Sequence, residues 1–285
     1  MLGIVILNYN TWNETLQCVE SIRRFTSTPH RIYVIDNFST VKAKKEQVER
    51  LRSLEVEMIY NTSNSGYAAG NNVGLKVAYE DGCDLFLISN SDVLVEDASI
   101  DMLCDFALKT SGAGVVGPLI YDTEGRRQPI HMLSKLTAVG KIKNMLLSTP
   151  LRSLFRKFEK GFVTRERPEH PIKVFGVSGC CFLVTRECYE KVFPFDEHTF
   201  LYEEEYILGC RMEQAGIDAY IYPDAHIIHA EAVSTGGMSP FSYKCLVESE
   251  QYYLQQYLHT GRGMLWLIRL LRHINWNIRY KQKKG

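Results

Sequence analysis

The sequence predicts an α/β fold in which a mostly parallel central sheet is flanked by helices. Short apolar runs alternate with segments of helical periodicity through the first 120 residues, a pattern typical of βαβ units. Polar residues directly follow several of these apolar runs, as they do where parallel strands end at a ligand site. The chain has 285 residues, 45% of them hydrophobic, so it is long enough to bury a sizeable core.

In the first half, apolar runs of strand length are separated by segments whose apolar residues lie three or four positions apart. Leu16, Val19 and Ile22, for example, have the spacing of one helix face. The expected strands are residues 3–7, 31–35, 56–60 and 84–88, and the expected helices are residues 14–25, 42–54 and 69–79.

The second half is less regular. We expect a strand pair over residues 174–185, turning through Gly176 and Gly179, and a helix over residues 203–216 that ends at Gly216. Further expected elements are short strands at residues 219–222 and 226–229, a helix at residues 243–258, and an amphipathic tail at residues 263–284.

Bulk composition argues against several classes of protein. Lys plus Arg and Asp plus Glu both number 33, and this zero net charge disfavours a nucleic-acid-binding protein. The 8 cysteines include no CxxC pair, which disfavours a zinc ribbon. Several of them (Cys18, Cys104 and Cys210) lie in apolar runs, which indicates a reducing compartment. The apolar N-terminus is too short for a signal peptide, and no segment approaches the roughly 20 apolar residues of a membrane span, so a cytoplasmic location is expected.

Polar residues gather at the expected carboxyl ends of the strands. Because parallel strands end at one edge of a sheet, we expect these side chains to line one rim, where ligands bind in such folds. Taken singly, each residue also fits an ordinary loop; the set on one rim favours a site. The set is Asn8, Tyr9 and Asn10, then Asp36 and Asn37, then Asn64, then Asn90, Ser91 and Asp92.

Two carboxylates on this rim suggest particular roles. Asp92 ends the run Ser89-Asn90-Ser91-Asp92, and a diphosphate supplies enough oxygens that one or two protein ligands suffice to hold Mg²⁺ or Mn²⁺. Asp36 can accept hydrogen bonds from a base N–H or a ribose hydroxyl. The alternatives are helix caps, for the helix near Asp97 and for the one after Asp36. No GxGxxG motif follows either early strand, so a dinucleotide site is disfavoured.

Two groups in the second half can carry chemistry. Glu203, Glu204 and Glu205 open a helix, where the helix dipole favours acids whatever their function. One of them, facing a cleft, could take a proton as a general base, and the residues alone do not say which. His226 and His229 could be a core pair or a pair of metal ligands.

Together these segments resemble the family 2 glycosyltransferases, which have the GT-A fold. Seven matching segments lie in the family's order over about the first 235 residues, and the subgroup resembles bacterial rhamnosyltransferases of cell-surface polysaccharide assembly. The resemblance implies an inverting, single in-line displacement that moves a sugar from a UDP- or dTDP-sugar, such as dTDP-rhamnose, to a glycan or lipid-linked acceptor. The segments are residues 4–10, 35–40, 64–74, 87–93, 179–186, 195–216 and 223–229.

The resemblance also implies roles for single residues. Asp92 and His229 would hold Mn²⁺ or Mg²⁺, and Glu205, preceded by Glu204, would be the catalytic base. Asp36 would bind the base or ribose. The full donor-binding set would be Asn8, Tyr9, Asn10, Asp36, Asn37, Asn64, Gly66, Asn71, Asn90 and Ser91.

Three departures from the family pattern bear on these roles. The family commonly has Asp where this chain has Glu205, Ile207 replaces an acid, and Ser91 replaces a Pro. A nucleotidyltransferase is an alternative, but it normally has a Gly-rich loop after the first strand, which this chain lacks. A non-catalytic nucleotide-binding subunit is a second alternative, against which Asp36, Asp92 and His229 argue.

The resemblance divides the chain into a GT-A domain over residues 1–235, with a nucleotide-binding half (1–120) and an acceptor half (121–235), and a helical extension over residues 236–285. The tail over 263–284 interleaves apolar and basic residues and has no acids. This composition is typical of an interfacial helix on an anionic membrane, which predicts a peripheral location at the inner face of the cytoplasmic membrane. The alternative is a helix packed on the body with a solvated basic face. Residues 126–162, with nine Lys or Arg and one acid, could border a lipid-linked acceptor.

Overall fold

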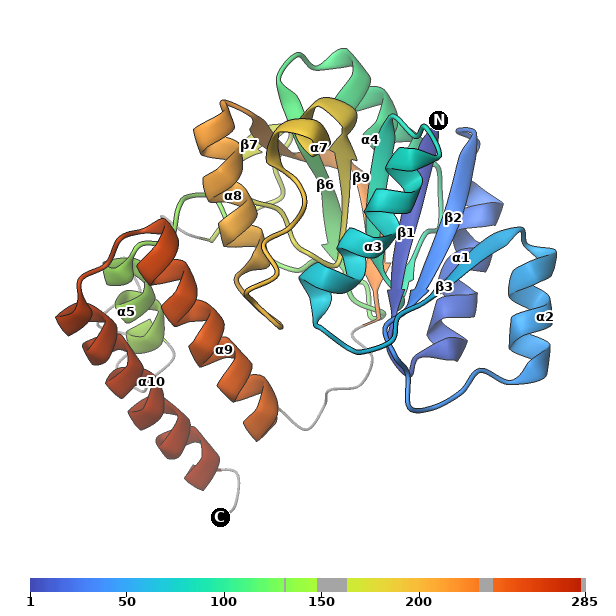
Figure 1. Cartoon of the computed structure of the whole chain (residues 1–285). Coiled ribbons are helices and arrows are strands. Elements are labelled where there is room, and N and C mark those ends of the chain that lie inside the picture. Colours follow the sequence, from blue (N-terminus) through green and yellow to red (C-terminus); the bar gives the residue numbers. More distant parts are fainter. Residues whose placement is uncertain (131, 148–162, 231–237, 283–285) are drawn as a thin grey trace.

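The computed structural model describes residues 1–130, 132–147, 163–230 and 238–282. Its centre is a mixed sheet with helices on both faces, as Figure 1 shows. Among the described residues the sheet has nine strands in the order β3-β2-β1-β4-β8-β6-β9-β5, and β7 pairs with β9. The α/β architecture with a largely parallel first half therefore agrees with the prediction.

The N-terminal half is a parallel four-stranded unit, because β1 pairs with β2 and β4, and β2 pairs with β3. Alternate residues of β1 enter different cores: Ile4 and Ile6 pack toward α1, and Val5 packs toward α3. The elements are β1 (Leu2–Asn8), α1 (Trp12–Phe25), β2 (His30–Asp36), α2 (Lys45–Ser53), β3 (Val56–Tyr60), α3 (Tyr67–Glu80) and β4 (Leu85–Asn90).

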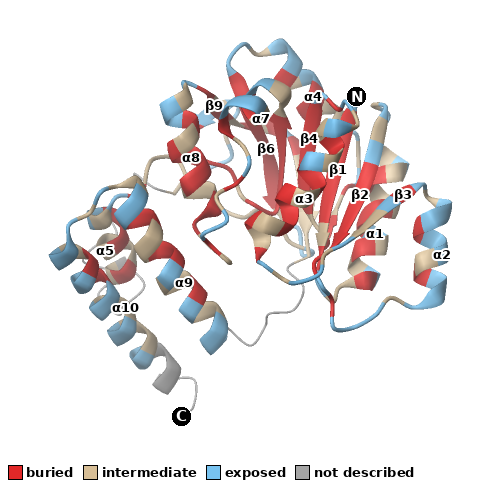
Figure 2. Cartoon of the chain, in the orientation of Figure 1, coloured by how far each residue is buried: buried red, intermediate tan, exposed pale blue. Residues whose placement is uncertain are grey.

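The remaining strands make the sheet mixed. β8 runs antiparallel to both β4 and β6, whereas β6 and β9 are parallel. Figure 2 shows the buried strands at the centre and exposed residues on the outer helix faces. The elements are β5 (Val93–Leu94), α4 (Ser99–Lys109), β6 (Ala113–Tyr121), β7 (Ile172–Val174), β8 (Cys181–Thr185), α7 (Arg186–Val192), α8 (Glu204–Ala215) and β9 (Asp218–His229).

Two expectations for this half are wrong. The strands expected to pair over residues 174–185 do not pair with each other: β7 pairs with β9, and β8 pairs with β4 and β6. The two short strands expected after residue 218 are one strand, β9, whose register against β6 shifts between Tyr222 and His226. In both cases the partner strand is remote in sequence, so local periodicity did not specify the pairing.

The C-terminal residues form a helical layer beside α8. It contains α9 (Pro240–Tyr252), a π-helical turn (Tyr253–Tyr257) and α10 (Arg262–Gln282). It also includes α5 (Ala138–Leu147), which comes from the middle of the chain and packs on α10. A third core joins the layer to α8 through Met145, Ile207, Tyr253 and Ile268. In the part of the chain that is described, no helix is both long and apolar enough to cross a membrane.

Candidate active site

The register of β1 and β2 places Asn8 opposite Asp36 at the carboxyl edge of the sheet. Asn8 Nδ2 donates to Asp36 Oδ1 at 3.4 Å and to Ser39 Oγ at 3.2 Å. The Ser39 N–H donates to Asp36 Oδ1 at 3.0 Å, and the Asn10 N–H donates to Ser39 Oγ at 2.8 Å. These hydrogen bonds therefore connect the loops after the two strands in one network of largely buried polar groups.

A second group of contacts borders the start of α3. Asn37 Nδ2 donates to Asn64 Oδ1 at 2.9 Å and to the Gly66 carbonyl at 3.1 Å. Gly66 has a φ of +97°, and a Cβ there would lie 2.2 Å from the Phe200 carbonyl oxygen, so only glycine fits. No side chain caps α3. The N–H of its first residue, Tyr67, donates to the Phe200 carbonyl, and helix N-termini of this kind are suited to bind an anion.

Asp92 is tied to the same rim by a chain of side-chain contacts. Asn8 Oδ1 accepts from Thr11 Oγ1 at 3.1 Å, and Thr11 Oγ1 lies 2.7 Å from Ser91 Oγ. The next residue, Asp92, has its Oδ1 3.2 Å from His229 Nε2, and the two side chains are 13% and 16% exposed. The pairing of Val93 with His229 in the short β5–β9 ladder sets this approach.

The donor set at Asp92 and His229 fits a divalent cation bound together with a diphosphate. A carboxylate oxygen and an imidazole nitrogen are ligand types that Mn²⁺ accepts. Within the described ranges, no group of three or more His, Cys, Asp or Glu side chains is arranged to hold a metal. Two protein ligands would thus need ligand oxygens to complete the shell. His226 is not part of this pair, since its Nδ1 lies 3.5 Å from Asp97 Oδ2 instead.

The three consecutive glutamates have three different environments, which the sequence could not distinguish. Glu203 is buried in an ion pair with Lys141. Glu204 is also buried, and its Oε1 has no hydrogen-bond partner among the described residues. Glu205 remains partly exposed, and its Oε1 accepts from the Gly179 N–H at 3.1 Å. Burial raises the pKa of both Glu204 and Glu205, and their mutual repulsion adds to the shift of Glu204.

The loop at Ser178–Cys180 lies between the Asp92–His229 pair and these glutamates. The Cys180 carbonyl accepts from the Asn90 N–H at 2.7 Å, and the Gly179 carbonyl accepts from the Tyr67 hydroxyl at 2.6 Å. Burial raises the pKa of the Cys180 thiol to about 12, and the nearby carboxylates of Asp92 and Glu205 contribute to this rise. The loop therefore contacts both Asn90, two residues before Asp92, and Glu205.

Sequence reasoning missed the side chains that connect these groups, chiefly Thr11, Ser39 and Tyr67. Ser39 belongs to a segment that resembles the family, but a serine in a loop gives no distinct signal. Of the predicted donor residues, Asn71 is fully buried; its Nδ2 donates to the Tyr67 carbonyl, and its Oδ1 has no hydrogen-bond partner among the described residues. The backbone N–H of Asn90 donates to the Cys180 carbonyl. Tyr9, by contrast, is exposed at the rim.

A model of the family described as Glycosyl transferase family 2 matches residues 3–193, and the chain belongs to this family. It is 28% identical over 273 residues to N-acetylglucosaminyl-diphospho-decaprenol L-rhamnosyltransferase of Mycobacterium tuberculosis, covering 92% of this chain and 86% of that protein. It is 25% identical over 231 residues to dTDP-rhamnosyl transferase RfbF of Shigella flexneri, covering 79% of this chain and 68% of that protein. The resemblance to rhamnosyltransferases of this family is thereby confirmed.

Comparison with solved structures supports the fold. The crystal structure of GalNAc-T7 with UDP, GalNAc and Mn²⁺ matches with a TM-score of 0.60 at 16% identity, covering 96% of this chain and 55% of that chain. At this identity the likeness concerns the fold alone, and it confirms the predicted GT-A class.

The buried acids make stability depend on pH. Because the folded-state pKa of Glu204 is raised from 4.5 to about 8, the folded state binds more protons than the unfolded chain between these values, and stability falls as pH rises through that window. We expect Glu204→Gln to raise Tm by at least about 3 °C at pH 8, since one pKa unit is worth about 1.4 kcal/mol and about 1 kcal/mol moves Tm by roughly 2 to 4 °C.

At pH 5 the same substitution should leave Tm nearly unchanged, because Glu204 is then protonated and Gln is its neutral isostere. Glu213→Gln, at an exposed position of the same helix, is the control and should give the same change in Tm at both pH values. Scanning calorimetry measures both. An equal effect of Glu204→Gln at pH 5 and pH 8 would contradict the raised pKa.

Proposed function

We propose that this family 2 glycosyltransferase inverts the anomeric centre as it moves a sugar from a nucleotide-diphosphate donor to a hydroxyl of a glycan or lipid-linked acceptor. The observation that carries the proposal is the chain of contacts from Asp36 through Asn8 and Thr11 to Ser91, beside the Asp92–His229 pair. These contacts place Asp36, which could bind the nucleoside, on the same rim as Asp92 and His229, which could bind a metal ion. Names of the two relatives favour dTDP-rhamnose as donor and a diphospho-lipid acceptor in cell-surface polysaccharide assembly.

Donor binding is assigned to the loops after β1, β2 and β3. Asp36 accepts from the base or ribose, held in place by Asn8, while Asn10 and Asn37 shape the adjoining loops. Tyr9 and Phe38 are exposed aromatic residues on these loops, where a ring can stack on a base. Asn64 and Gly66 border the N-terminus of α3, which no side chain caps and which suits the diphosphate.

Asp92 and His229 would hold Mn²⁺ or Mg²⁺, which offsets charge on the departing nucleoside diphosphate when bound. The structure of GalNAc-T7 contains Mn²⁺, which supports a divalent ion in this fold. Ser91 and Asn90 position Asp92 through the Thr11 hydroxyl and the Cys180 carbonyl, respectively.

Glu205 is proposed as the base that takes the proton from the acceptor hydroxyl. Its partial exposure supports this choice over Glu204, which is buried, and over Glu203, which Lys141 neutralises. Its raised pKa brings it nearer to the pH at which a base accepts protons efficiently. Glu204 lies next to it, and repulsion from the Glu205 carboxylate helps to raise the pKa of Glu204.

A membrane surface is the second proposed partner, through α10. One face of α10 is buried against the body by Leu265 and Ile268. The opposite face exposes an apolar stripe that the fold does not use, and Trp266 on it is 65% exposed. Arg262 and Arg269 also belong to α10, and segments of this composition bind anionic interfaces. The stripe is Trp266, Leu267, Leu270, Ile274 and Ile278.

These assignments keep the proposed division into a nucleotide-binding half over residues 1–120, an acceptor half over 121–235 and an extension over 236–285, with the protein peripheral at the inner face of the cytoplasmic membrane. Much of the basic segment expected beside the acceptor lies outside the described residues. Its described helix, α5, packs on α10, which associates the acceptor half with the membrane-facing helix.

A panel of nucleotide sugars with Mn²⁺ tests the activity. The true donor should raise Tm most, because a ligand at 100 times its Kd stabilises by about 2.7 kcal/mol, or roughly 5 to 10 °C. With acceptor present, it should release nucleoside diphosphate. Stabilisation without release of product, across acceptors that include polyprenyl diphosphate-linked sugars, would instead indicate a binding subunit.

Two substitutions should separate the metal site from the base. Asp92→Ala should abolish transfer and weaken Mn²⁺-dependent nucleotide binding about tenfold or more, because it removes a metal ligand. Glu205→Gln should lower kcat by about 100-fold or more while nucleotide Kd stays within about twofold. Calorimetry with the nucleoside diphosphate and initial-rate kinetics measure the two effects. Asp105→Ala, at an exposed position on α4, is the control; loss of nucleotide binding in Glu205→Gln would argue against its role as base.

Membrane binding should depend on the exposed stripe of α10. Deleting the tail would remove the buried Leu265 and Ile268, so point substitutions are the cleaner test. Trp266→Ala with Leu270→Ala should weaken partitioning onto phosphatidylglycerol vesicles about tenfold or more, since each large side chain contributes roughly 1.5 to 3 kcal/mol when buried. Leu108→Ala, at an exposed position of α4, is the matched control. Equal co-sedimentation of both variants would exclude this face.

A further inference from the structure

The segment over residues 196–203, which leads into α8, is held by the C-terminal helices at several points. Asp196 Oδ2 accepts from the hydroxyls of Tyr252 and Tyr257 at 2.8 and 2.6 Å. The Leu201 carbonyl accepts from Ser249 Oγ at 2.9 Å. The opposite side of the segment meets the proposed donor site, where the Tyr67 N–H donates to the Phe200 carbonyl at 3.0 Å. This segment therefore lies between the donor site and the C-terminal layer.

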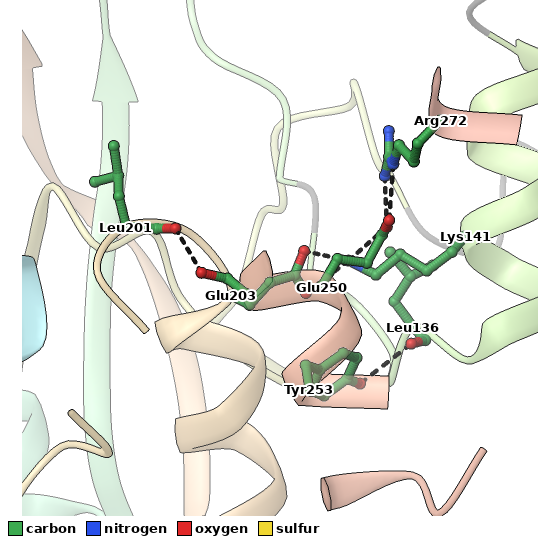
Figure 3. A network of polar contacts seen from close by, with 8 residues as sticks. Leu136, Lys141, Leu201, Glu203, Glu250, Tyr253 and Arg272 are labelled. Atoms are coloured by element: carbon green, nitrogen blue, oxygen red, sulfur yellow. Dashed lines mark hydrogen bonds and ion pairs between the residues drawn. The ribbon is translucent and has the colours of Figure 1, made fainter. Parts of the chain in front are cut away.

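The strongest of these contacts is a buried ionic chain that ends at Glu203. Lys141 Nζ lies 2.6 Å from Glu203 Oε2 and 3.8 Å from Glu250 Oε1. Arg272 donates to both carboxylate oxygens of Glu250, from Nη2 at 2.6 Å and from Nε at 2.8 Å. Figure 3 shows the chain running from α10 through α9 and α5 to the start of α8.

Water has little access to this chain. The side chains of Lys141, Glu203 and Glu250 are 3%, 5% and 0% exposed, and that of Arg272 is 21% exposed. The rings of Tyr206 and Tyr253 face Lys141 Nζ at 4.9 and 5.5 Å from their centroids. Two cations balance two carboxylates, so each charge depends on its neighbours. Well-packed apolar residues can stabilise a fold as well as such a network does, which favours a role in fixing geometry.

Glu203 has a backbone conformation that needs support from its surroundings. Its φ is +72°, and that of Tyr202 is +77°, a region that residues other than glycine occupy only when the structure around them holds them there. The Glu203 carbonyl accepts from the Ile207 N–H at 2.9 Å, in the first turn of α8. Holding the Glu203 side chain therefore fixes the turn from which Glu204 and Glu205 project.

We propose that Arg272 and Glu250 are positioning residues for transfer. Through Lys141 they hold Glu203 in its left-handed conformation, and so direct Glu205 toward Gly179 and the acceptor. The inference rests on the proposed role of Glu205 as base. It makes the C-terminal layer part of the catalytic apparatus, since α10 carries both Arg272 and the exposed stripe.

Charge-neutral double variants test this without leaving an unpaired buried charge. Glu250→Gln with Arg272→Met removes the remote pair and leaves Lys141 on Glu203. We expect kcat to fall about 10- to 100-fold, the effect of misplacing a catalytic group by about 1 Å, with donor KM and nucleotide Kd within about twofold. Glu248→Gln is the matched control on the same helix, because this glutamate is 65% exposed, and it should leave kcat unchanged.

Three further measurements separate positioning from a merely structural role. Lys141→Met with Glu203→Gln should lower kcat similarly, and combining both pairs should lower it no further, because they act through one path. Arg272→Lys keeps the charge but not the two-point contact, so its kcat should lie between those of the wild-type protein and the remote double variant. Hydrogen exchange should quicken over residues 196–207 in the remote double variant while β1 and β4 stay protected.

Wild-type kcat in the folded remote double variant would overturn the proposal, as would unchanged exchange over residues 196–207. If the double variant fails to fold, full wild-type kcat together with wild-type exchange in Arg272→Lys would overturn it instead. Failure of the proposed function is distinguishable, because the wild-type protein would then show no transfer, whereas failure of the base role alone would leave transfer intact in Glu205→Gln. In either case the exchange measurement would still report whether Arg272 and Glu250 hold the segment.

Discussion

The buried amide of Asn8 is the contact on which the arrangement of the rim depends. One end of this side chain donates to Asp36 and Ser39, and the other accepts from Thr11 and Thr15. A single asparagine thus ties the loop after β2 to the start of α1, and Thr11 extends the link to Ser91 beside Asp92. An amide is suited to this position because it is both donor and acceptor without charge. The parallel register of β1 and β2 places Asn8 opposite Asp36 and so makes the contact possible. The geometry of the site therefore depends on the pairing of these two strands.

The features of the fold and the site that depend on residues near one another in sequence were predictable, and those that depend on remote residues were not. β3 has the expected bounds, and the rim residues after β1, β2 and β4 lie at one edge because parallel strands must end together. The pairings of β7 and β8 were not predictable, since each joins segments remote in sequence. The different environments of the three glutamates were not predictable for the same reason, because Lys141, which pairs with Glu203, is 62 positions away in the sequence. Periodicity locates elements, but it does not say which charges meet.

The site is assembled from two halves that meet at the Ser178–Cys180 loop. On one side are Asp92 and His229, placed by β5 and β9; on the other are Glu204 and Glu205, placed by α8. The loop carries almost no side-chain bulk at Gly179, where a Cβ would lie 2.6 Å from Glu205 Oε1. Glycine lets the backbone N–H reach the carboxylate, so a main-chain donor helps to fix the position of the proposed base.

The two faces of α10 have different surroundings, because one packs within the C-terminal layer and the other is exposed. Ile268 and Leu265 bury one face, and Arg272 on the same helix reaches Glu250 inside the layer. Trp266 and Ile274 leave the other face apolar and exposed. The same helix therefore carries Arg272, whose contacts lead through Glu250 and Lys141 to Glu203, and the exposed apolar stripe. An acceptor with a polyprenyl tail is presented at a membrane surface. The proposed membrane contact and the proposed positioning role of Arg272 thus lie on one helix, which connects the place of a lipid-linked acceptor to the position of Glu205 through described side-chain contacts.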